Sequence, residues 1–170
     1  MNTTQSPARA PSPGQPAVIS YPSDTELVIT REFNAPRALV LDAITKPEHV
    51  RQWYGMSEDG MKVCEIDFRV GGKWHYVLSG PPGEDDISFS GEYLSIDLPD
   101  GFTSTESFDN MPGATYFARI TLIENDGVTT LQNHLTYPSQ EWRDGHVNSG
   151  MEYGMNISYN RLDDLLARLS

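Results

Sequence analysis

The C-terminal segment is the one long stretch of this chain whose apolar residues follow a helical period. Over residues 151–169 they recur at spacings of three and four, which is typical of an amphipathic helix. Residues 26–137 read mainly as short strands, so a sheet is the only surface large enough to cover this stripe. Residues 150–155 are rich in methionine and glycine, which predicts loose packing and room for a cavity at this end. The stripe consists of Met151, Met155, Tyr159, Leu162, Leu166 and Leu169.

The bulk properties indicate one globular domain and argue against several classes of partner. A chain of 170 residues, 38% of them hydrophobic, suits a single domain with a modest core. Its net charge of −12 disfavours binding to nucleic acid or to anionic lipid surfaces. No apolar run approaches the roughly 18 residues of a membrane span, and the N-terminus lacks the apolar region of a secretory signal. We therefore expect a cytoplasmic protein that does not insert into a membrane.

The single cysteine, Cys64, rules out an intramolecular disulfide. It lies in a predicted strand, where we expect a small buried hydrophobic residue rather than a reactive thiol. A chain without a disulfide fits a reducing compartment.

The N-terminal segment has the composition of a disordered tail. Residues 1–22 hold five of the twelve prolines, and serine, threonine, alanine and glutamine fill most of the rest. Such a segment cannot bury enough apolar surface to offset the entropy of ordering it. We expect a tail over residues 1–22 and a single domain over residues 23–170.

The order of predicted elements is one strand, two short helices, about six further strands and a long helix. Pro36 starts the first short helix. Thr45 and Glu48 match a capping box for the second, which should run to about Trp53. The pair Asp126-Gly127 is the strongest hairpin signal. The predicted strands cover residues 26–33, 63–68, 74–78, 87–96, 102–108, 116–123 and 128–137.

Several motifs in this order resemble the START-like (SRPBCC, Bet v 1-like) superfamily, and in particular its branch related to the C-terminal domain of the heat-shock protein 90 ATPase activator. The resemblance covers residues 26–169, nearly the whole domain. Together these motifs indicate the fold, but a fold does not by itself determine a function. The matching segments are residues 31–36, 45–48, 53–55, 67–74, 91–93, 105–108, 149–155 and 158–162.

The resemblance implies an α+β helix-grip fold. In this fold a curved antiparallel sheet of about six to seven strands wraps around the long C-terminal helix, and two short helices follow the first strand. It also implies a hydrophobic cavity between the helix and the sheet, with a small apolar or aromatic molecule as the partner.

Strand alternation indicates which side chains would face such a cavity, because successive side chains point to opposite faces. The more apolar face of each strand is taken as the inner one, and the first turns of the helix complete the lining. Without the cavity that the resemblance implies, the same set is more typical of a plain hydrophobic core, and with it the two interpretations are equally supported. The candidate ligand-binding residues are Trp74, Tyr76, Leu78, Tyr116, Ile120, Leu135, Met151, Met155 and Tyr159.

The sequence assigns no catalytic residue, no metal ligand and no cofactor. The four histidines lack metal-ligand spacing, and we expect His146 to be a solvated residue at the start of the last helix. Glu92 and Glu106 lie on adjacent predicted strands, where they could pair with Arg69 or Arg119. An ion pair on the outer face is the simpler interpretation, and acid–base chemistry inside a cavity is the alternative.

Three functions are compatible with these features. The first is binding of a small hydrophobic or aromatic ligand. The second is a chaperone ATPase-activator-like interaction module, which would bind a protein partner. The third is a cyclase or hydrolase acting on a bound aromatic compound. The sequence leaves open whether the protein is a monomer or a dimer.

Overall fold

The computed structural model describes residues 14–55, 60–111, 113 and 115–170. The described residues form eight strands and four helices. All strand pairs are antiparallel, and the sheet has the order β1-β2-β8-β7-β6-β5-β4-β3. The strands are β1 (Val18–Ser20), β2 (Glu26–Phe33), β3 (Met61–Ile66), β4 (Lys73–Leu78), β5 (Ile87–Asp97), β6 (Gly101–Phe108), β7 (Thr115–Asn125) and β8 (Val128–Thr136). The helices are α1 (Arg37–Thr45), α2 (Pro47–Trp53), α3 (Gln140–Asn148) and α4 (Met151–Leu169).

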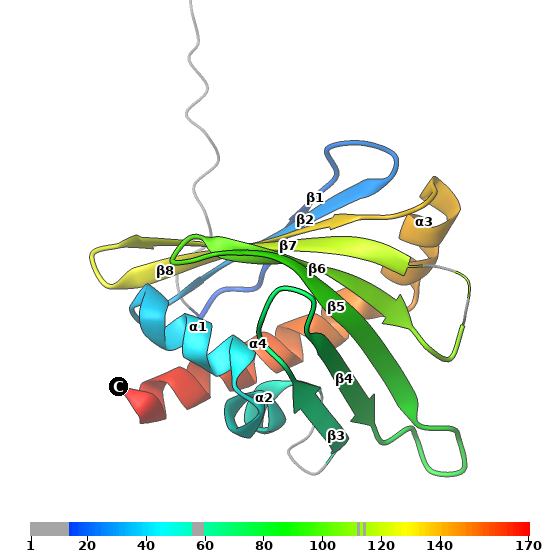
Figure 1. Cartoon of the computed structure of the whole chain (residues 1–170), viewed down its shortest axis with the longest axis horizontal. Helices are drawn as coiled ribbons and strands as arrows, with labels where there is room; N and C mark the ends of the chain where they lie inside the picture. The colour runs from blue at the N-terminus through cyan, green and yellow to red at the C-terminus, as the bar shows by residue number, and fades with distance from the viewer. Residues whose placement is uncertain (1–13, 56–59, 112, 114) are drawn as a thin grey trace, which may run out of the picture.

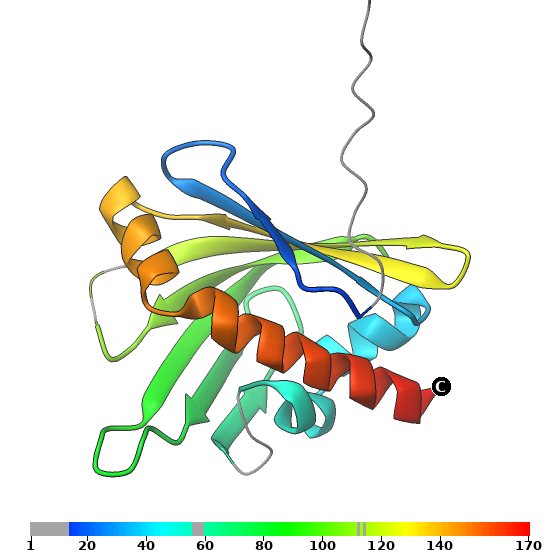
Figure 2. The same ribbon diagram turned by 180° about the vertical axis from the view of Figure 1, so that it is seen from behind.

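The sheet curves around α4, as the helix-grip prediction requires. Figures 1 and 2 show α4 lying along the concave side of the sheet, with α1 and α2 beside its C-terminal half and α3 at the other end. The predicted α+β fold is confirmed, including the two short helices between β2 and the rest of the sheet.

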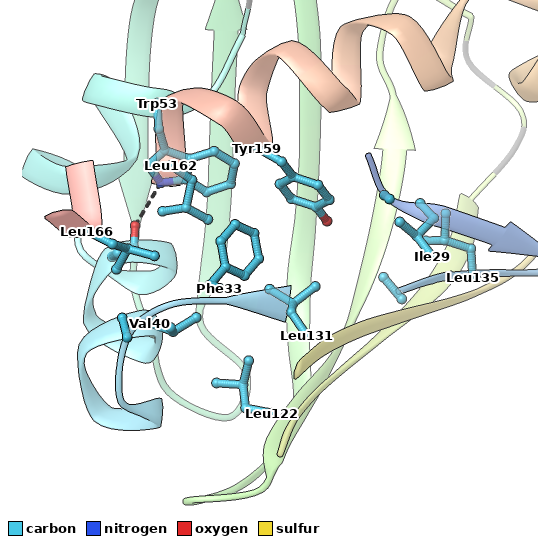
Figure 3. Close-up of a cluster of buried hydrophobic side chains, with 14 of the residues drawn as sticks. Ile29, Phe33, Val40, Trp53, Leu122, Leu131, Leu135, Tyr159, Leu162 and Leu166 are labelled. Carbon is cyan, nitrogen blue, oxygen red and sulfur yellow. Dashed lines mark hydrogen bonds between the residues drawn. The ribbon is translucent and has the colours of Figure 1, made fainter. Parts of the chain in front are cut away.

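The two short helices are joined by a buried side chain. The Trp53 indole Nε1 at the end of α2 donates a hydrogen bond of 2.8 Å to the carbonyl of Ala43 in α1 (Figure 3). The predicted capping box is wrong. Lys46 is the N-cap of α2, and the Thr45 hydroxyl instead donates to the Leu41 carbonyl within α1, at 2.7 Å.

The hairpin between β7 and β8 has the predicted turn. Asp126 and Gly127 have φ angles of 51° and 78°, both in the left-handed region. A two-residue turn of this kind matches the twist of the strands it joins, which explains why Asp-Gly is favoured there.

The domain begins earlier in the chain than predicted. Val18–Ser20 forms β1 and pairs with β2, within the segment expected to be a tail. This strand is held by polar contacts from distant elements. The Ala17 amide donates to Asn156 Oδ1 at 3.0 Å, and Arg31 Nε donates to the Gln15 carbonyl at 2.9 Å. The rest of the predicted tail, residues 1–13, lies outside the described residues.

The C-terminal segment is two helices and not one. The α3 helix begins at the N-cap Ser139, whose hydroxyl accepts a hydrogen bond from the Trp142 amide. Gly150 then adopts a φ of 87° between α3 and α4. Glycine takes this left-handed conformation without strain, so the chain can turn sharply here before α4 begins.

The core lies between α4 and the half of the sheet around β2, β7 and β8. Phe33 from β2 meets Tyr159 from α4 edge to face, with ring centroids 5.5 Å apart. Leu162 and Leu166 extend the contact toward the C-terminus (Figure 3). The predicted role of Cys64 as a buried hydrophobic residue is also confirmed, and burial raises the pKa of its thiol to about 11.

Substituting Gly154 by alanine is expected to stabilise the protein by about 0.5–1 kcal/mol. Gly154 lies within α4, and a Cβ added there would meet no atom within 4 Å. The gain comes from helix propensity alone. The matched control is Gly150→Ala, which should lower the free energy of unfolding by about 1 kcal/mol because of the positive φ. Urea denaturation measures both, and a loss of stability in Gly154→Ala would contradict the open space around it.

Candidate ligand-binding interior

The nine predicted ligand-binding residues all lie on the elements that enclose the interior. Two hydrophobic clusters meet there. The first lies between α4 and the strands β2, β7 and β8. Its buried members include Tyr116, Leu135 and Tyr159, and Ile120, Met151 and Met155 pack against it. The second lies over β3, β4, β5 and β6. Its buried members include Trp74 and Tyr76, and Leu78 and Ile120 pack against it. Ile120 contacts both clusters, so the predicted set spans the boundary between them.

The nine predicted residues differ in how far they are buried. Trp74, Tyr76, Tyr116, Leu135 and Tyr159 are buried. The remaining four predicted residues keep intermediate exposure although they face the interior. These four are Leu78, Ile120, Met151 and Met155.

Aromatic rings line both sides of this boundary. Tyr54, just after α2, packs against Tyr76 of β4 with ring centroids 4.9 Å apart. Across the sheet Tyr116 stacks on Tyr137, which follows β8, also at 4.9 Å. Tyr54 and Tyr137 were not among the nine predicted residues. The alternation of β8 indicated Tyr137, whereas nothing in the sequence indicated Tyr54.

Glu106 is the acidic side chain of the interior. It lies on β6, on the same face as Phe102 and Ser104, and is paired with Tyr116 of β7. Burial raises the pKa of its carboxyl to about 7, and the Tyr116 hydroxyl offsets this in part. A buried carboxyl resists ionisation because the charged form loses its hydration.

The predicted ion pair of Glu106 on the outer face is wrong. Arg119 binds Asp97 through its Nη1 at 2.6 Å, and Arg69 binds Asp67 through its Nε at 2.7 Å. Among the described residues no ion pair involves Glu106. Glu92 is exposed on the opposite face of the sheet. The signal that could have located Glu106 was its alternation with Phe102 and Ser104.

The tyrosine hydroxyls around Glu106 remain protonated. Burial raises the pKa of Tyr159 to about 12, and it raises the pKa values of the other four tyrosines further. The negative charge of Glu106 adds to the rise in all five cases. Neutral phenols can donate hydrogen bonds to a ligand or to the carboxylate. The five are Tyr54, Tyr76, Tyr116, Tyr137 and Tyr159.

His146 is part of this interior and not a solvated residue at a helix start. It lies in α3, and its Nδ1 is 2.5 Å from the Tyr137 hydroxyl. Burial lowers the pKa of His146 to about 4, so the imidazole is neutral at pH 7. The expectation failed because the sequence did not reveal that α3 is a separate helix folded back over the end of β8.

Asn133 supplies a second polar group to the inner face. It lies on β8 opposite Ile120 of β7. Its Oδ1 is buried and has no hydrogen-bond partner among the described residues. A buried acceptor without a partner costs free energy, which a ligand with a donor could recover.

Two depressions on the surface of the described residues lie elsewhere. The larger, of about 400 Å³, is bordered by the C-terminal end of α4 and by Gly14 and Asn34. The smaller, of about 210 Å³, lies beside Phe117 and Pro138 and is also lined by Tyr137, the neighbour of Tyr116. None of the nine predicted ligand-binding residues lines either depression.

Within the described residues no helix is both long and apolar enough to cross a membrane. The same part of the chain contains no group of three or more histidine, cysteine or acidic residues placed to hold a metal ion.

A curved antiparallel sheet that grips a C-terminal helix defines the START-like, or SRPBCC, class of proteins. Residues 34–167 match the family described as "Activator of Hsp90 ATPase homolog 1-like protein", so the chain belongs to that family. A search of curated proteins gave no match.

Solved structures with the same fold come from several bacteria. A Rhodobacter sphaeroides protein is 26% identical, with a TM-score of 0.82, over 91% of this chain and 99% of its own. A Mycobacterium smegmatis protein is 28% identical, with a TM-score of 0.78, over 89% and 97% of the two chains. A Staphylococcus epidermidis protein is 27% identical, with a TM-score of 0.74, over 89% and 94%.

Proposed function

We propose that this protein binds a small hydrophobic or aromatic molecule between α4 and the concave face of the sheet. The observation that carries the proposal is the state of Glu106. Its carboxyl is desolvated strongly enough to raise its pKa to about 7, yet the residue keeps intermediate exposure. A carboxyl can be desolvated and still keep accessible surface if that surface faces a space inside the domain.

The surrounding side chains support the same conclusion. Leu78, Ile120, Met151 and Met155 face the interior and are only half-buried. Interior side chains in a close-packed core would lose nearly all of their accessible surface. Methionine also adapts its shape to different apolar partners, which suits a ligand pocket.

The upper limit of the expected affinity follows from buried area. A two-ring aromatic molecule that buries about 250 Å² of apolar surface gains about 6 kcal/mol at roughly 25 cal/mol per Å². This free energy corresponds to a dissociation constant of tens of micromolar, before the cost of immobilising the ligand. Binding in this range is measurable by calorimetry.

The experiment is a titration of the protein with 2-naphthalenemethanol, a neutral aromatic probe. Ile120→Trp adds bulk to the boundary between the two clusters and should weaken binding about tenfold or more. Phe117→Trp on the same strand is the matched control, because Phe117 points outward and is 49% exposed. Leu78→Trp is a second filling variant if Ile120→Trp does not fold. If the Ile120→Trp or Leu78→Trp variant, the Phe117→Trp control and the unaltered protein bound the probe equally well, binding between α4 and the sheet would be contradicted.

The raised pKa of Glu106 also favours a second candidate, acid–base chemistry on a bound aromatic compound. A carboxyl with a pKa of about 7 is present in both protonation states near neutral pH, as a general acid or base requires. In a cyclase or hydrolase of this kind, Glu106→Gln would abolish turnover and leave ligand affinity largely intact. Activation of an Hsp90 ATPase stays a prediction from the family resemblance.

A further inference from the structure

We propose that the preferred ligand is an organic cation, an apolar or aromatic molecule that carries an ammonium group and places it against Glu106. This inference rests on the ligand-binding function proposed above and names the chemical class of that ligand.

The first argument is the missing counter-charge. Among the described residues, Glu106 has no ion-pair partner, and no basic side chain contributes to its pKa. The buried cation of the domain is Arg31, which is already bound to Asp163 at 2.5 Å and to Asn160. A carboxylate enclosed without a cation is costly, and a ligand that brings the positive charge removes that cost.

The second argument is the ring of aromatic side chains. Tyr116 of β7 lies directly opposite Glu106 and stacks on Tyr137, with ring centroids 4.9 Å apart. Tyr54 packs on Tyr76 of β4, also at 4.9 Å. The charge of Glu106 contributes to the raised pKa values of these four tyrosines and of Tyr159 on α4. Cations are attracted to the faces of such rings because the ring face carries partial negative charge.

Three other groups adjoin these rings. The Arg31 guanidinium, already paired with Asp163, lies 5.9 Å from the centre of the Tyr159 ring, and the charge of Arg143 acts on Tyr137. His146 is hydrogen-bonded to Tyr137 and is neutral at pH 7.

This arrangement discriminates by charge. A ligand carboxylate would place a second negative charge beside Glu106 in a water-poor interior, where like charges repel strongly. A neutral alcohol would gain the apolar contacts without the ion pair. The order of affinities should therefore be amine, then alcohol, then carboxylate.

Three probes with the same ring system test the order: 2-naphthylmethylamine, 2-naphthalenemethanol and 2-naphthoic acid. Each is titrated into the full chain at about pH 8, where Glu106 is ionised and the amine is still charged. We expect the amine to bind about tenfold more tightly than the alcohol. In Glu106→Gln the preference should fall to about twofold or less, whereas Glu92→Gln, which changes an exposed carboxylate on the other face, should keep it.

The pH dependence gives a second readout that does not need a variant. Because the amine pairs with the ionised carboxylate, its binding near pH 7 should release a proton, and its affinity should rise about tenfold between about pH 5.5 and pH 8. The affinity of the alcohol should not rise over this range. Alcohol binding equal to amine binding would overturn the cation proposal and leave the proposed function standing. Failure of all three probes to bind would overturn both.

Discussion

Replacing Asp163 by alanine is expected to lower the free energy of unfolding by about 3 kcal/mol. Asp163 is the ion-pair partner of Arg31, whose side chain has no exposed surface beneath α4. Without Asp163 the guanidinium would remain buried with an uncompensated charge, since its Nη1 already lacks a partner among the described residues. The loss falls at the low end of the range for buried pairs because the Asp163 side chain is 22% exposed.

The matched control for Asp163→Ala replaces both charges. A double variant, Arg31→Leu with Asp163→Leu, removes the buried charge together with its partner and should recover about half of the loss or more. Urea denaturation at pH 7 compares the three proteins. A single variant as stable as the unaltered protein would mean that Arg31 is hydrated in solution and not buried.

Replacing Glu106 by glutamine is expected to change how stability depends on pH. The folded-state pKa of Glu106 is raised to about 7 from its ordinary value of 4.5, so the folded chain holds this proton more tightly than the unfolded chain. The stability contributed by this group is therefore fully present below about pH 4.5 and is lost as pH rises through about 7. The shift corresponds to about 3 kcal/mol at 1.36 kcal/mol per pKa unit.

The comparison must be made as a difference between the two proteins. His146 has the opposite dependence, because its lowered pKa removes stability as pH falls from about 6.5 to about 4. Its contribution and those of other groups cancel when the variant is compared with the unaltered protein at each pH. We expect the stability of Glu106→Gln relative to the unaltered protein to increase by about 3 kcal/mol between about pH 4.5 and pH 7.5. A constant difference would mean that Glu106 is solvated.

Elements defined by local pattern could be predicted from the sequence. The alternation of β4, β7 and β8 correctly placed Tyr76, Tyr116 and Leu135 on the inner face, where all three are buried. The Asp126-Gly127 turn was predictable because two positive φ angles in succession need such residues.

Features defined by contacts between distant residues could not be predicted. β1 has too few residues for a strand pattern, and it is fixed by Asn156 and Arg31 from elsewhere in the chain. The role of His146 depended on a helix break at Gly150. The strand alternation put Glu106 on the same face as Phe102 and Ser104, but a charged residue is ordinarily expected to face solvent. Only the fold brings Glu106 close to the tyrosines.

The most direct measurement of the central claim is an NMR titration of protein labelled with ¹³C in the methionine methyl groups. Met151 and Met155 are partly buried against the core between α4 and the sheet, where we propose that the ligand binds, whereas Met111 is 56% exposed in the loop after β6. Addition of 2-naphthalenemethanol should shift the Met151 and Met155 signals, because aromatic rings alter the shifts of methyl groups packed on them, and should leave Met111 unchanged. Unchanged Met151 and Met155 signals at saturating probe would contradict ligand binding between α4 and the sheet.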